Sequence, residues 1–297
     1  MPLNDGLVVA AHGRHFIVET AQRDRVLCHR RGKKVDCVVG DHVRWDIAGD
    51  GGVIEEVLPR RSLLSRQDRW RSKSFAANID DVLIIVAATP PMAEPLLARA
   101  LIACAHAGIA AQVLLNKVDM PEADAARERL RPYREMGVPV LEASLKHDMA
   151  VARALLEALL NGRITLLLGA SGVGKSTLIN ALVPDAAAQV GEISRALNAG
   201  RHTTTTTTWY WLSDAPGTAV LDSPGFQEFG LQQIEAADLA AWLPDVAAHS
   251  AACRFTNCTH RSEPDCAVRA AAERGDIAPG RLRLYQQLYE ELARPRW

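Results

Sequence analysis

The feature that most constrains the fold of this chain is the glycine-rich segment Gly-Ala-Ser-Gly-Val-Gly-Lys-Ser at residues 169–176. It follows the apolar run Ile164–Leu168 and opens a helical pattern over 177–182, which is the strand–loop–helix context of a phosphate-binding loop. The backbone N–H groups of such a loop and the positive end of its helix surround a phosphate. We predict that Lys175 bridges the β- and γ-phosphates as a catalytic residue and that Ser176 holds Mg²⁺.

The whole loop is predicted to bind nucleotide. Gly174 should lie so close to the β-phosphate that a side chain there would collide with it. The alternative, a glycine-rich turn that binds nothing, is weakened because every fixed position of the pattern is present. The predicted phosphate and magnesium contacts are Gly169, Ala170, Ser171, Gly172, Val173, Gly174, Lys175, Ser176 and Thr177.

Around this loop, apolar runs alternate with helical patterns, which is typical of a parallel sheet with helices on both faces. Two later strand patterns, 206–212 and 218–222, are joined by a short connection and should form an antiparallel hairpin. We therefore expect an α/β fold: a P-loop domain with a six-stranded mixed sheet and one antiparallel edge. The other strand patterns are 81–87, 112–115, 138–141 and 164–168, and the helical patterns are 94–107, 124–135 and 149–160.

A second motif, Asn116-Lys117-Val118-Asp119, ends one of these buried strands. Guanine offers two adjacent donors, N1–H and the N2 amino group, and one carboxylate accepts both. We predict that Asp119 reads guanine in this way, while Asn116 also ties the motif to the phosphate loop and Lys117 covers the ring. Ser144 would be the helper loop under the base, although Leu145 stands where GTPases usually have alanine.

The switch elements follow later in the chain. Asp222 begins the segment Asp-Ser-Pro-Gly; its carboxylate can hold Mg²⁺ through water, and the N–H of Gly225 can meet the γ-phosphate. The run Thr203 to Thr208 should supply one Mg²⁺ ligand, for which we favour Thr205. The alternative is a threonine-rich β-edge, which propensity alone favours.

The residue expected to act in hydrolysis departs from the usual pattern. Phe226 occupies the position where many GTPases carry a water-orienting glutamine, and phenylalanine cannot polarise water. Either turnover is intrinsically slow, or His202 substitutes, or a partner supplies the missing group. We therefore expect slow turnover of the isolated protein.

The six cysteines fall into two groups. Cys28, Cys37 and Cys104 lie in apolar surroundings and are expected to be small core residues. Three others crowd around a histidine in a spacing that favours one structural Zn²⁺ in a closed tetrahedral site rather than disulfides. The alternative is buried cysteines beside an unrelated histidine. The predicted ligands are Cys253, Cys258, His260 and Cys266.

Outside the P-loop domain, the chain from Gly6 to about Leu64 contains short strand patterns split by turns, which favour a small closed β-barrel of the OB type. Residues 63–77 are polar and basic and suggest a linker. A basic bunch (Arg23, Arg25, Arg30, Arg31, Lys33 and Lys34) could meet a phosphate-rich partner or be a solvated turn. The N-terminus carries no secretory signal pattern, and no apolar run approaches the roughly 18 residues of a membrane span. We expect a cytoplasmic protein.

The order of the motifs is circularly permuted, because the Asn-Lys-x-Asp motif precedes the phosphate loop. Nearly the whole chain resembles the ribosome small-subunit-dependent GTPase A family (RsgA/YjeQ). The features that carry this resemblance are the permuted order, the cysteine cluster and the motifs G-x-S-G-V-G-K-S, G-R-H-T-T-T and D-S-P-G-F. The resemblance implies an N-terminal OB barrel, late maturation of the small ribosomal subunit, GTP hydrolysis stimulated by that subunit, and a hydrolytic role for His202. Three features depart from the pattern of this family. Ala170 stands where the family usually has glutamine, the Ser144 motif is weak, and the threonine run is longer than the family's G-R-H-T-T-T core.

The expected organisation is an RNA-binding barrel at 1–70, the permuted GTPase domain at 71–230, and a helical zinc-binding domain at 231–297. The expected partners are GTP and GDP, with Mg²⁺, and the small ribosomal subunit with its rRNA; we expect a monomer with no membrane contact. One alternative is a metabolic P-loop enzyme that uses GTP as phosphoryl donor, for which we find no acceptor-site motif. Another is a zinc-stabilised RNA-binding protein with a dead nucleotide site.

Overall fold

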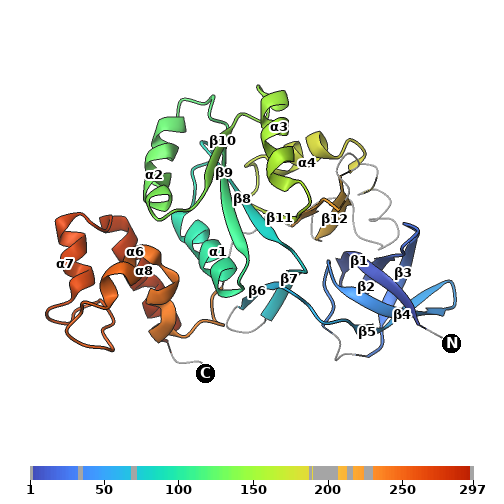
Figure 1. The fold of residues 1–297 in the computed structure, drawn as a ribbon, viewed down its shortest axis with the longest axis horizontal. Helices are drawn as coiled ribbons and strands as arrows, with labels where there is room; N and C mark the ends of the chain where they lie inside the picture. The colour runs from blue at the N-terminus through green and yellow to red at the C-terminus, as the bar shows by residue number, and fades with distance from the viewer. Residues whose placement is uncertain are drawn as a thin grey trace.

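The computed structural model describes residues 3–32, 36–67, 72–186, 189, 207–212, 217–223 and 230–294. A central α/β part lies between an N-terminal barrel and a group of C-terminal helices, which sit on opposite sides of it (Figure 1). None of the described helices has the length and apolar character that a membrane span requires.

The N-terminal barrel has the strand order β1-β2-β3-β5-β4 and is closed by pairing of β1 with β4. All neighbours are antiparallel except β3 and β5, which run parallel. Glycine permits the tight interior, because a Cβ at Gly52 would lie 2.6 Å from the ring of Trp45. The prediction of a closed OB-like barrel is confirmed. Its strands are β1 (Asn4–His12), β2 (His15–Glu19), β3 (Arg25–Arg30), β4 (His42–Ala48) and β5 (Gly51–Val57).

The prediction of a linker at 63–77 is wrong. This segment forms an antiparallel hairpin of β6 (Leu63–Gln67) and β7 (Ser72–Ala77). Leu64 and Ala76 are fully buried, and Phe75 is nearly so. Because side chains alternate across a strand, a few inward apolar residues are enough to bury a segment that looks polar in composition.

The central sheet has the order β10-β9-β8-β11-β13-β12. Its strands are parallel except β12, which runs antiparallel to β13. The predicted six-stranded mixed sheet with one antiparallel edge is therefore confirmed. The strands are β8 (Asp81–Ala87), β9 (Ala110–Asn116), β10 (Val140–Ala143), β11 (Ile164–Leu168), β12 (Thr208–Trp211) and β13 (Ala219–Asp222).

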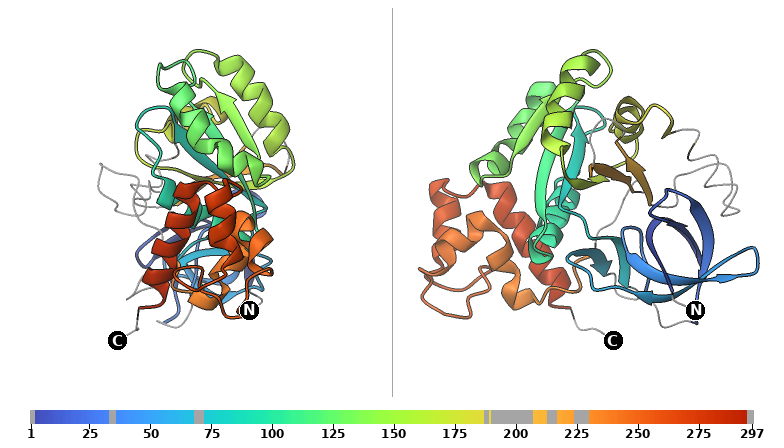
Figure 2. Two further views of the ribbon diagram at one scale, coloured as in Figure 1. Left: turned by 90° about the vertical axis from the view of Figure 1, so that its left-hand side faces the viewer. Right: turned by 45° about the vertical axis from the view of Figure 1, so that its right-hand side comes forward.

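Helices cover both faces of this sheet (Figure 2). Alternate residues of β8 divide between two cores: Val82 and Ile84 pack in the core of α1 and α2, whereas Leu83 and Ile85 pack in the core of α3 and α4. This alternation explains why the strand is a continuous apolar run. The helices are α1 (Glu94–His106), α2 (Ala123–Glu135), α3 (Met149–Leu160) and α4 (Lys175–Leu182).

The edge strand β12 also joins the barrel. Thr208 pairs with Asp222 of β13 and with Ala10 of β1, so one strand belongs to both parts. Beyond it, the indole Nε1–H of Trp211 donates to Oε1 of the buried Glu19 at 2.8 Å. The barrel is thus attached directly to the strand that lies beside the predicted Asp222 switch.

The C-terminal helices pack against α1. Arg99 of α1 pairs with Glu291 at 3.0 Å between Nη1 and Oε1, and the ring of His106 lies 5.3 Å from that of Trp242. One face of the last helix, including Tyr285 and Leu288, is buried, and Pro279 stands in its first turn. The elements are the 3₁₀ helix η1 (Ala236–Trp242) and the helices α6 (Pro244–Ser250), α7 (Ala267–Arg274) and α8 (Pro279–Leu292).

Candidate nucleotide and metal sites

The predicted nucleotide motifs meet at one rim of the central sheet. Asn116 ends β9, Leu168 precedes the phosphate loop at the end of β11, and Asp222 ends β13. Because these strands are parallel, their carboxyl ends lie at the same edge, where open α/β sheets bind ligands. Segments far apart in the chain are therefore brought together.

The phosphate loop begins against the sheet and turns sharply. A Cβ at Gly169 would lie 2.6 Å from the carbonyl oxygen of Ile85, so glycine allows the close approach to β8. Gly172 and Gly174 have φ of +80° and +113°, values that favour glycine. The buried Val173 lies between them, while Ser171, Ser176 and Thr177 are exposed.

Asn116 joins the base-reading motif to this loop. Its Nδ2–H donates to the carbonyl oxygen of Val173 at 2.8 Å, and its Oδ1 accepts the N–H of Leu145 at 3.0 Å. A Cβ at Gly174 would lie 2.2 Å from the Asn116 Nδ2. The sequence correctly predicts this tie to the loop. The sequence predicted that a side chain at Gly174 would collide with the β-phosphate. In the structure, the atom that it would meet first is the Asn116 Nδ2.

The predicted guanine-reading carboxylate is held from two sides. The hydroxyl of Ser144 donates to Oδ1 of Asp119, and Nε2 of His147 lies 3.3 Å from Oδ2. The Ser144 hydrogen bond is the main reason that the pKa of Asp119 is lowered. Ser144, which the sequence places under the base, therefore contacts the carboxylate that is predicted to read that base.

A cavity of about 420 Å³ surrounds these groups, within the roughly 300–1,000 Å³ of small-molecule sites. Lys117 lines this cavity and donates from Nζ to the carbonyl oxygen of Thr89 at 2.7 Å. Val118, the next residue, is partly buried. Sequence reasoning missed Thr89 and His147. The signal for His147 was its place in the loop that follows Ser144; Thr89 takes part through its backbone, which carries no residue signal.

Lys175 and Asp222 face each other across the phosphate end of the site. Burial raises the pKa of Asp222 to about 6, with the charge of Lys175 opposing the rise. Burial also lowers the pKa of Lys175, whose Nζ donates to the carbonyl oxygens of Gly169 and Ala170 at 2.7 and 3.1 Å. Among the described residues, Oδ1 of Asp222 finds no hydrogen-bond partner. A buried carboxylate with an open oxygen is suited to a cation.

Three predicted residues lie outside the described ranges. They are His202 and Thr205 of the threonine-rich segment and Gly225 of the Asp222 switch. Their roles stay predictions.

The predicted metal ligands form one cluster in the C-terminal helical part. The donor atoms of Cys253, Cys258, His260 and Cys266 all lie within 4.8 Å of one another. The two sulfurs of Cys253 and Cys266 are 3.9 Å apart, and His260 Nδ1 lies 3.5 and 3.4 Å from them. Tetrahedral Zn²⁺ with Zn–S near 2.3 Å and Zn–N near 2.0–2.1 Å requires about 3.8 Å between sulfurs and about 3.5 Å from sulfur to nitrogen. The residues fit zinc.

The loop that carries these ligands is held by Glu263. Its carboxylate accepts the N–H of Thr259 at 2.8 Å and that of Arg261 at 3.1 Å. Although burial acts to raise the pKa of Glu263, these bonds and that of the Thr259 hydroxyl lower it to about 2. The loop is therefore ordered by side-chain contacts as well as by any metal.

The basic bunch of the barrel is partly neutralised within the protein. Glu19 accepts from Arg23 at 2.9 Å and from Arg25 at 3.3 Å, and Arg31 pairs with Glu55 at 2.9 Å. Lys33 and Lys34 lie outside the described residues. Cys28, Cys37 and Cys104 are buried, as the sequence predicts.

Comparison with known proteins agrees with this geometry. The family model described as RsgA GTPase matches residues 57–232. A protein of Variovorax paradoxus named small ribosomal subunit biogenesis GTPase RsgA is 53% identical over 300 residues, which cover 99% of this chain and 94% of that protein.

Two solved structures also resemble the whole chain. The crystal structure of YjeQ from Thermotoga maritima has a TM-score of 0.72 and 29% identity and covers 98% of this chain and 99% of its own. The structure of YloQ, described as a circularly permuted GTPase, has a TM-score of 0.68 and 25% identity and covers 99% of this chain and 97% of its own.

Proposed function

The chain belongs to the RsgA GTPase family, and with that as the premise we propose that it hydrolyses GTP during the biogenesis of the small ribosomal subunit. The observation that carries this proposal is the hydrogen bond from Asn116 to the carbonyl of Val173, which puts the guanine-reading motif and the phosphate loop in one site. The Variovorax relative, named for small-subunit biogenesis, is similar over nearly its full length.

In this site, guanine would lie between Lys117 and the loop of Ser144, with its two donors on Asp119. Ser144 already holds one oxygen of that carboxylate through a hydrogen bond, so the carboxylate is oriented before the base arrives. His147 would leave the other oxygen, or share it, when guanine binds. The β- and γ-phosphates would replace the carbonyl oxygens of Gly169 and Ala170 as partners of Lys175.

Mg²⁺ would be held by Ser176 and, through water, by Asp222, whose open Oδ1 fits a cation. When bound, the ion neutralises charge on the phosphates. Thr205 would complete its ligands, and the N–H of Gly225 would meet the γ-phosphate. His202 would take the place of the usual glutamine in orienting water, because Phe226 cannot.

The finer steps of the proposed role rest on the resemblance to the family and on Phe226, which stands where many GTPases carry a water-orienting glutamine. Turnover of the isolated protein is slow, the small subunit stimulates it, and hydrolysis releases the protein late in maturation. The barrel contacts rRNA, and the cluster of Cys253, Cys258, His260 and Cys266 holds one structural Zn²⁺ that leaves no position for water. The protein acts in the cytoplasm as a monomer.

The test is hydrolysis of GTP and ATP by the full chain, with and without small ribosomal subunits. Hydrolysis of GTP that the subunits stimulate supports the proposal. A requirement for a small-molecule phosphoryl acceptor would instead support a metabolic enzyme that uses GTP. Absence of turnover under both conditions would leave an RNA-binding protein with an inactive nucleotide site.

A further inference from the structure

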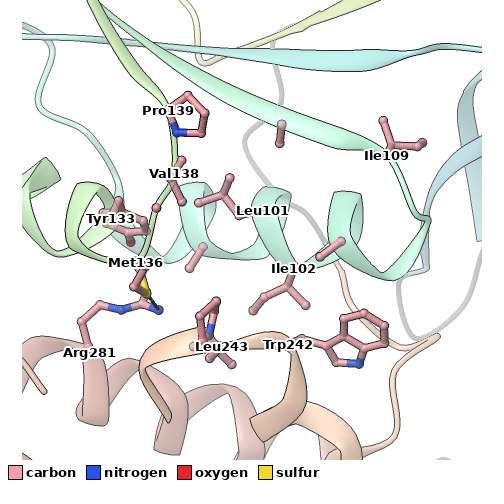
Figure 3. A pocket seen from close by; sticks show the side chains of 15 residues that line it. Leu101, Ile102, Ile109, Tyr133, Met136, Val138, Pro139, Trp242, Leu243 and Arg281 are labelled. Atoms are coloured by element: carbon pink, nitrogen blue, oxygen red, sulfur yellow. Dashed lines mark hydrogen bonds between the residues drawn. The ribbon is translucent and has the colours of Figure 1, made fainter. Parts of the chain in front are cut away.

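Two of the cavities formed by the described residues differ in what their walls offer a ligand. The cavity between α1, α2 and the C-terminal helices is lined mainly by apolar side chains, with Leu101 and Ile102 facing Leu243 (Figure 3). Such walls can hold a molecule without selecting it. In the nucleotide cavity, by contrast, polar side chains converge on the carboxylate of Asp119. One of them, His147, acts against the base that Asp119 is predicted to read.

Both oxygens of the Asp119 carboxylate are engaged by the protein itself. The hydroxyl of Ser144 donates to Oδ1, and Nε2 of His147 lies 3.3 Å from Oδ2. An imidazole nitrogen donates whenever it carries a hydrogen, as Nε2 does in the cation and in one neutral tautomer. Ser144 and His147 both line the nucleotide cavity. Each oxygen of the base-reading group therefore has a partner within the protein.

The two partners differ in how firmly they are held. Ser144 is 5% exposed, so its small hydroxyl stays against Oδ1. The side chain of His147 is 61% exposed, while its backbone is anchored, since its N–H donates to the carbonyl oxygen of Ser144 at 3.1 Å. An exposed ion pair of this kind changes an equilibrium constant by roughly threefold. The imidazole can therefore be displaced from Oδ2 at small cost.

Guanine needs both oxygens, because N1–H and the N2 amino group donate to the carboxylate side by side. The hydroxyl of Ser144 can share its oxygen with the base, since each carboxylate oxygen has two lone pairs. An imidazole at Oδ2 would bring a second N–H dipole against a donor of guanine, and the two repel each other. Hypoxanthine has N1–H but no amino group, so it requires one oxygen and can leave His147 in place. His147 therefore opposes guanine more than hypoxanthine.

We propose that His147 is a specificity-determining residue that competes with guanine for Oδ2 of Asp119. It lowers the affinity for guanine nucleotides and so reduces the preference for guanine over hypoxanthine. This role rests on the proposed GTP site, in which Asp119 reads the base. The loop of Ser144 thus has two opposite effects, since Ser144 supports the carboxylate and His147 limits its affinity for guanine.

The test compares GDP with inosine diphosphate, which differs from GDP only in lacking the N2 amino group. Dissociation constants are measured by calorimetry on the full-length parent and on His147→Ala, at one pH and one salt concentration. We expect the variant to bind GDP about threefold more tightly and to bind inosine diphosphate as the parent does. Equal changes for both nucleotides, or no change, would refute the competition. Weaker GDP binding would refute it too, because His147 would then contact guanine directly.

The affinity for ADP separates this proposal from the proposed function. A parent protein that binds ADP as tightly as GDP would have no guanine site, and both proposals would fail. A parent that prefers GDP to ADP would keep the GTP site. If the ratio of GDP to inosine diphosphate affinity is then the same in the parent and in His147→Ala, the role of His147 alone is overturned.

Two further variants serve as controls. His147→Gln places an amide nitrogen near the position of Nε2, so it should keep the parent's ratio of GDP to inosine diphosphate affinity. Lys146, the neighbouring cation, also lines the cavity and acts on Asp119 through its charge, so Lys146→Ala should change both affinities equally. A selective gain for GDP in either control would contradict the assignment of the Oδ2 contact to the imidazole.

A crystal structure of the parent with GDP gives a direct readout of the same contact. Nε2 of His147 should lie outside hydrogen-bond distance of Oδ2, whereas Ser144 should still donate to Oδ1. An imidazole that remains on Oδ2 beside bound guanine would overturn the proposal.

Discussion

Among single residues, Asn116 has the largest influence on the architecture of the site. Its side chain accepts a hydrogen bond from the N–H of Leu145, in the loop of Ser144, and donates one to the carbonyl oxygen of Val173, in the phosphate loop. The base-reading and phosphate-reading segments are therefore fixed relative to each other before any nucleotide binds. This preorganisation lowers the entropy that binding must overcome.

Gly174→Ala should disturb the contact between Asn116 and the phosphate loop. Its Cβ would lie 2.2 Å from the Asn116 Nδ2, in addition to the strain of a φ of +113°. Gly172→Ala is the matched control, since Gly172 has a φ of +80° but no atom within 4 Å of its Cβ. We expect the control to cost about 1 kcal/mol of unfolding free energy, and Gly174→Ala to cost more and to weaken GDP binding. Equal losses in urea unfolding and calorimetry would contradict this.

Asp222 is a second residue whose environment predicts a measurable effect. Its raised pKa, about 6, means that the folded protein keeps a proton that the unfolded chain loses from about pH 4. Folding stability therefore falls as pH rises through the window between these values. The buried charge is unfavourable until a cation compensates it.

Asp222→Asn should remove that loss. Since one pH unit corresponds to about 1.4 kcal/mol, the nucleotide-free variant should be more stable than the parent at pH 8 by on the order of 2–3 kcal/mol. The gain should shrink towards pH 4, and GTP hydrolysis should be lost. The gain in unfolding free energy is measured by urea unfolding in EDTA at several pH values. The control is Asp238→Asn, since Asp238 is exposed. A gain that does not change with pH would refute the explanation.

Among the elements, β12 has two roles, because it is the edge of the central sheet and also pairs with β1 of the barrel. The strand follows the threonine-rich segment and lies beside the strand that ends at Asp222. A change at either switch would therefore act on the strand that carries the barrel. Two side-chain contacts add to this attachment: the hydrogen bond from Trp211 to Glu19, at 2.8 Å, and the guanidinium of Arg23, which lies 4.0 Å from the centre of the Trp211 ring.

Glu19→Ala should loosen the attachment. It removes a buried carboxylate that accepts from Trp211, Arg23 and Arg25. We expect a loss of about 2 kcal/mol in unfolding free energy and faster amide exchange at 208–211. Glu55→Ala breaks only the more exposed pair with Arg31 and should cost less than about 0.5 kcal/mol. Unchanged exchange in β12 would show that the contact does not hold the strand.

The cysteine cluster belongs to the same scale, since it fixes a loop between α6 and α7. Cys266→Ser should abolish binding of Zn²⁺, measured as metal content, and speed amide exchange across 253–266. Cys104→Ser, at a buried thiol outside the cluster, should keep the metal. Full metal content in the Cys266 variant would remove this residue from the ligand set.

For the whole molecule, strand periodicity and local motifs were enough to predict the central sheet, its antiparallel edge, the barrel and the metal cluster. Each of these depends on patterns of residues that lie close together in the chain. The hairpin of β6 and β7 was missed, since its burial depends on a few alternating residues such as Leu64 that pack against distant parts of the chain. His147 and the shared use of β12 were also missed, because contacts between separate segments leave no local pattern.

The permuted order of the motifs also acts at this scale. The three motifs that end β9, β11 and β13 lie along one rim, although their order in the chain differs from that of conventional GTPases. A site of this kind depends on the position of its loops in space, so circular permutation can move the chain termini without changing the site. The central claim is therefore that these separate segments form one guanine site.

The most direct test is the base specificity of Asp119→Asn, measured as hydrolysis of GTP and XTP in the presence of small ribosomal subunits, beside the parent protein. Asparagine can donate to the 2-oxo group of xanthine and cannot accept both donors of guanine. We predict that the parent prefers GTP and that the variant loses this preference and gains activity on XTP. A variant that keeps the parent's preference for GTP would contradict the account.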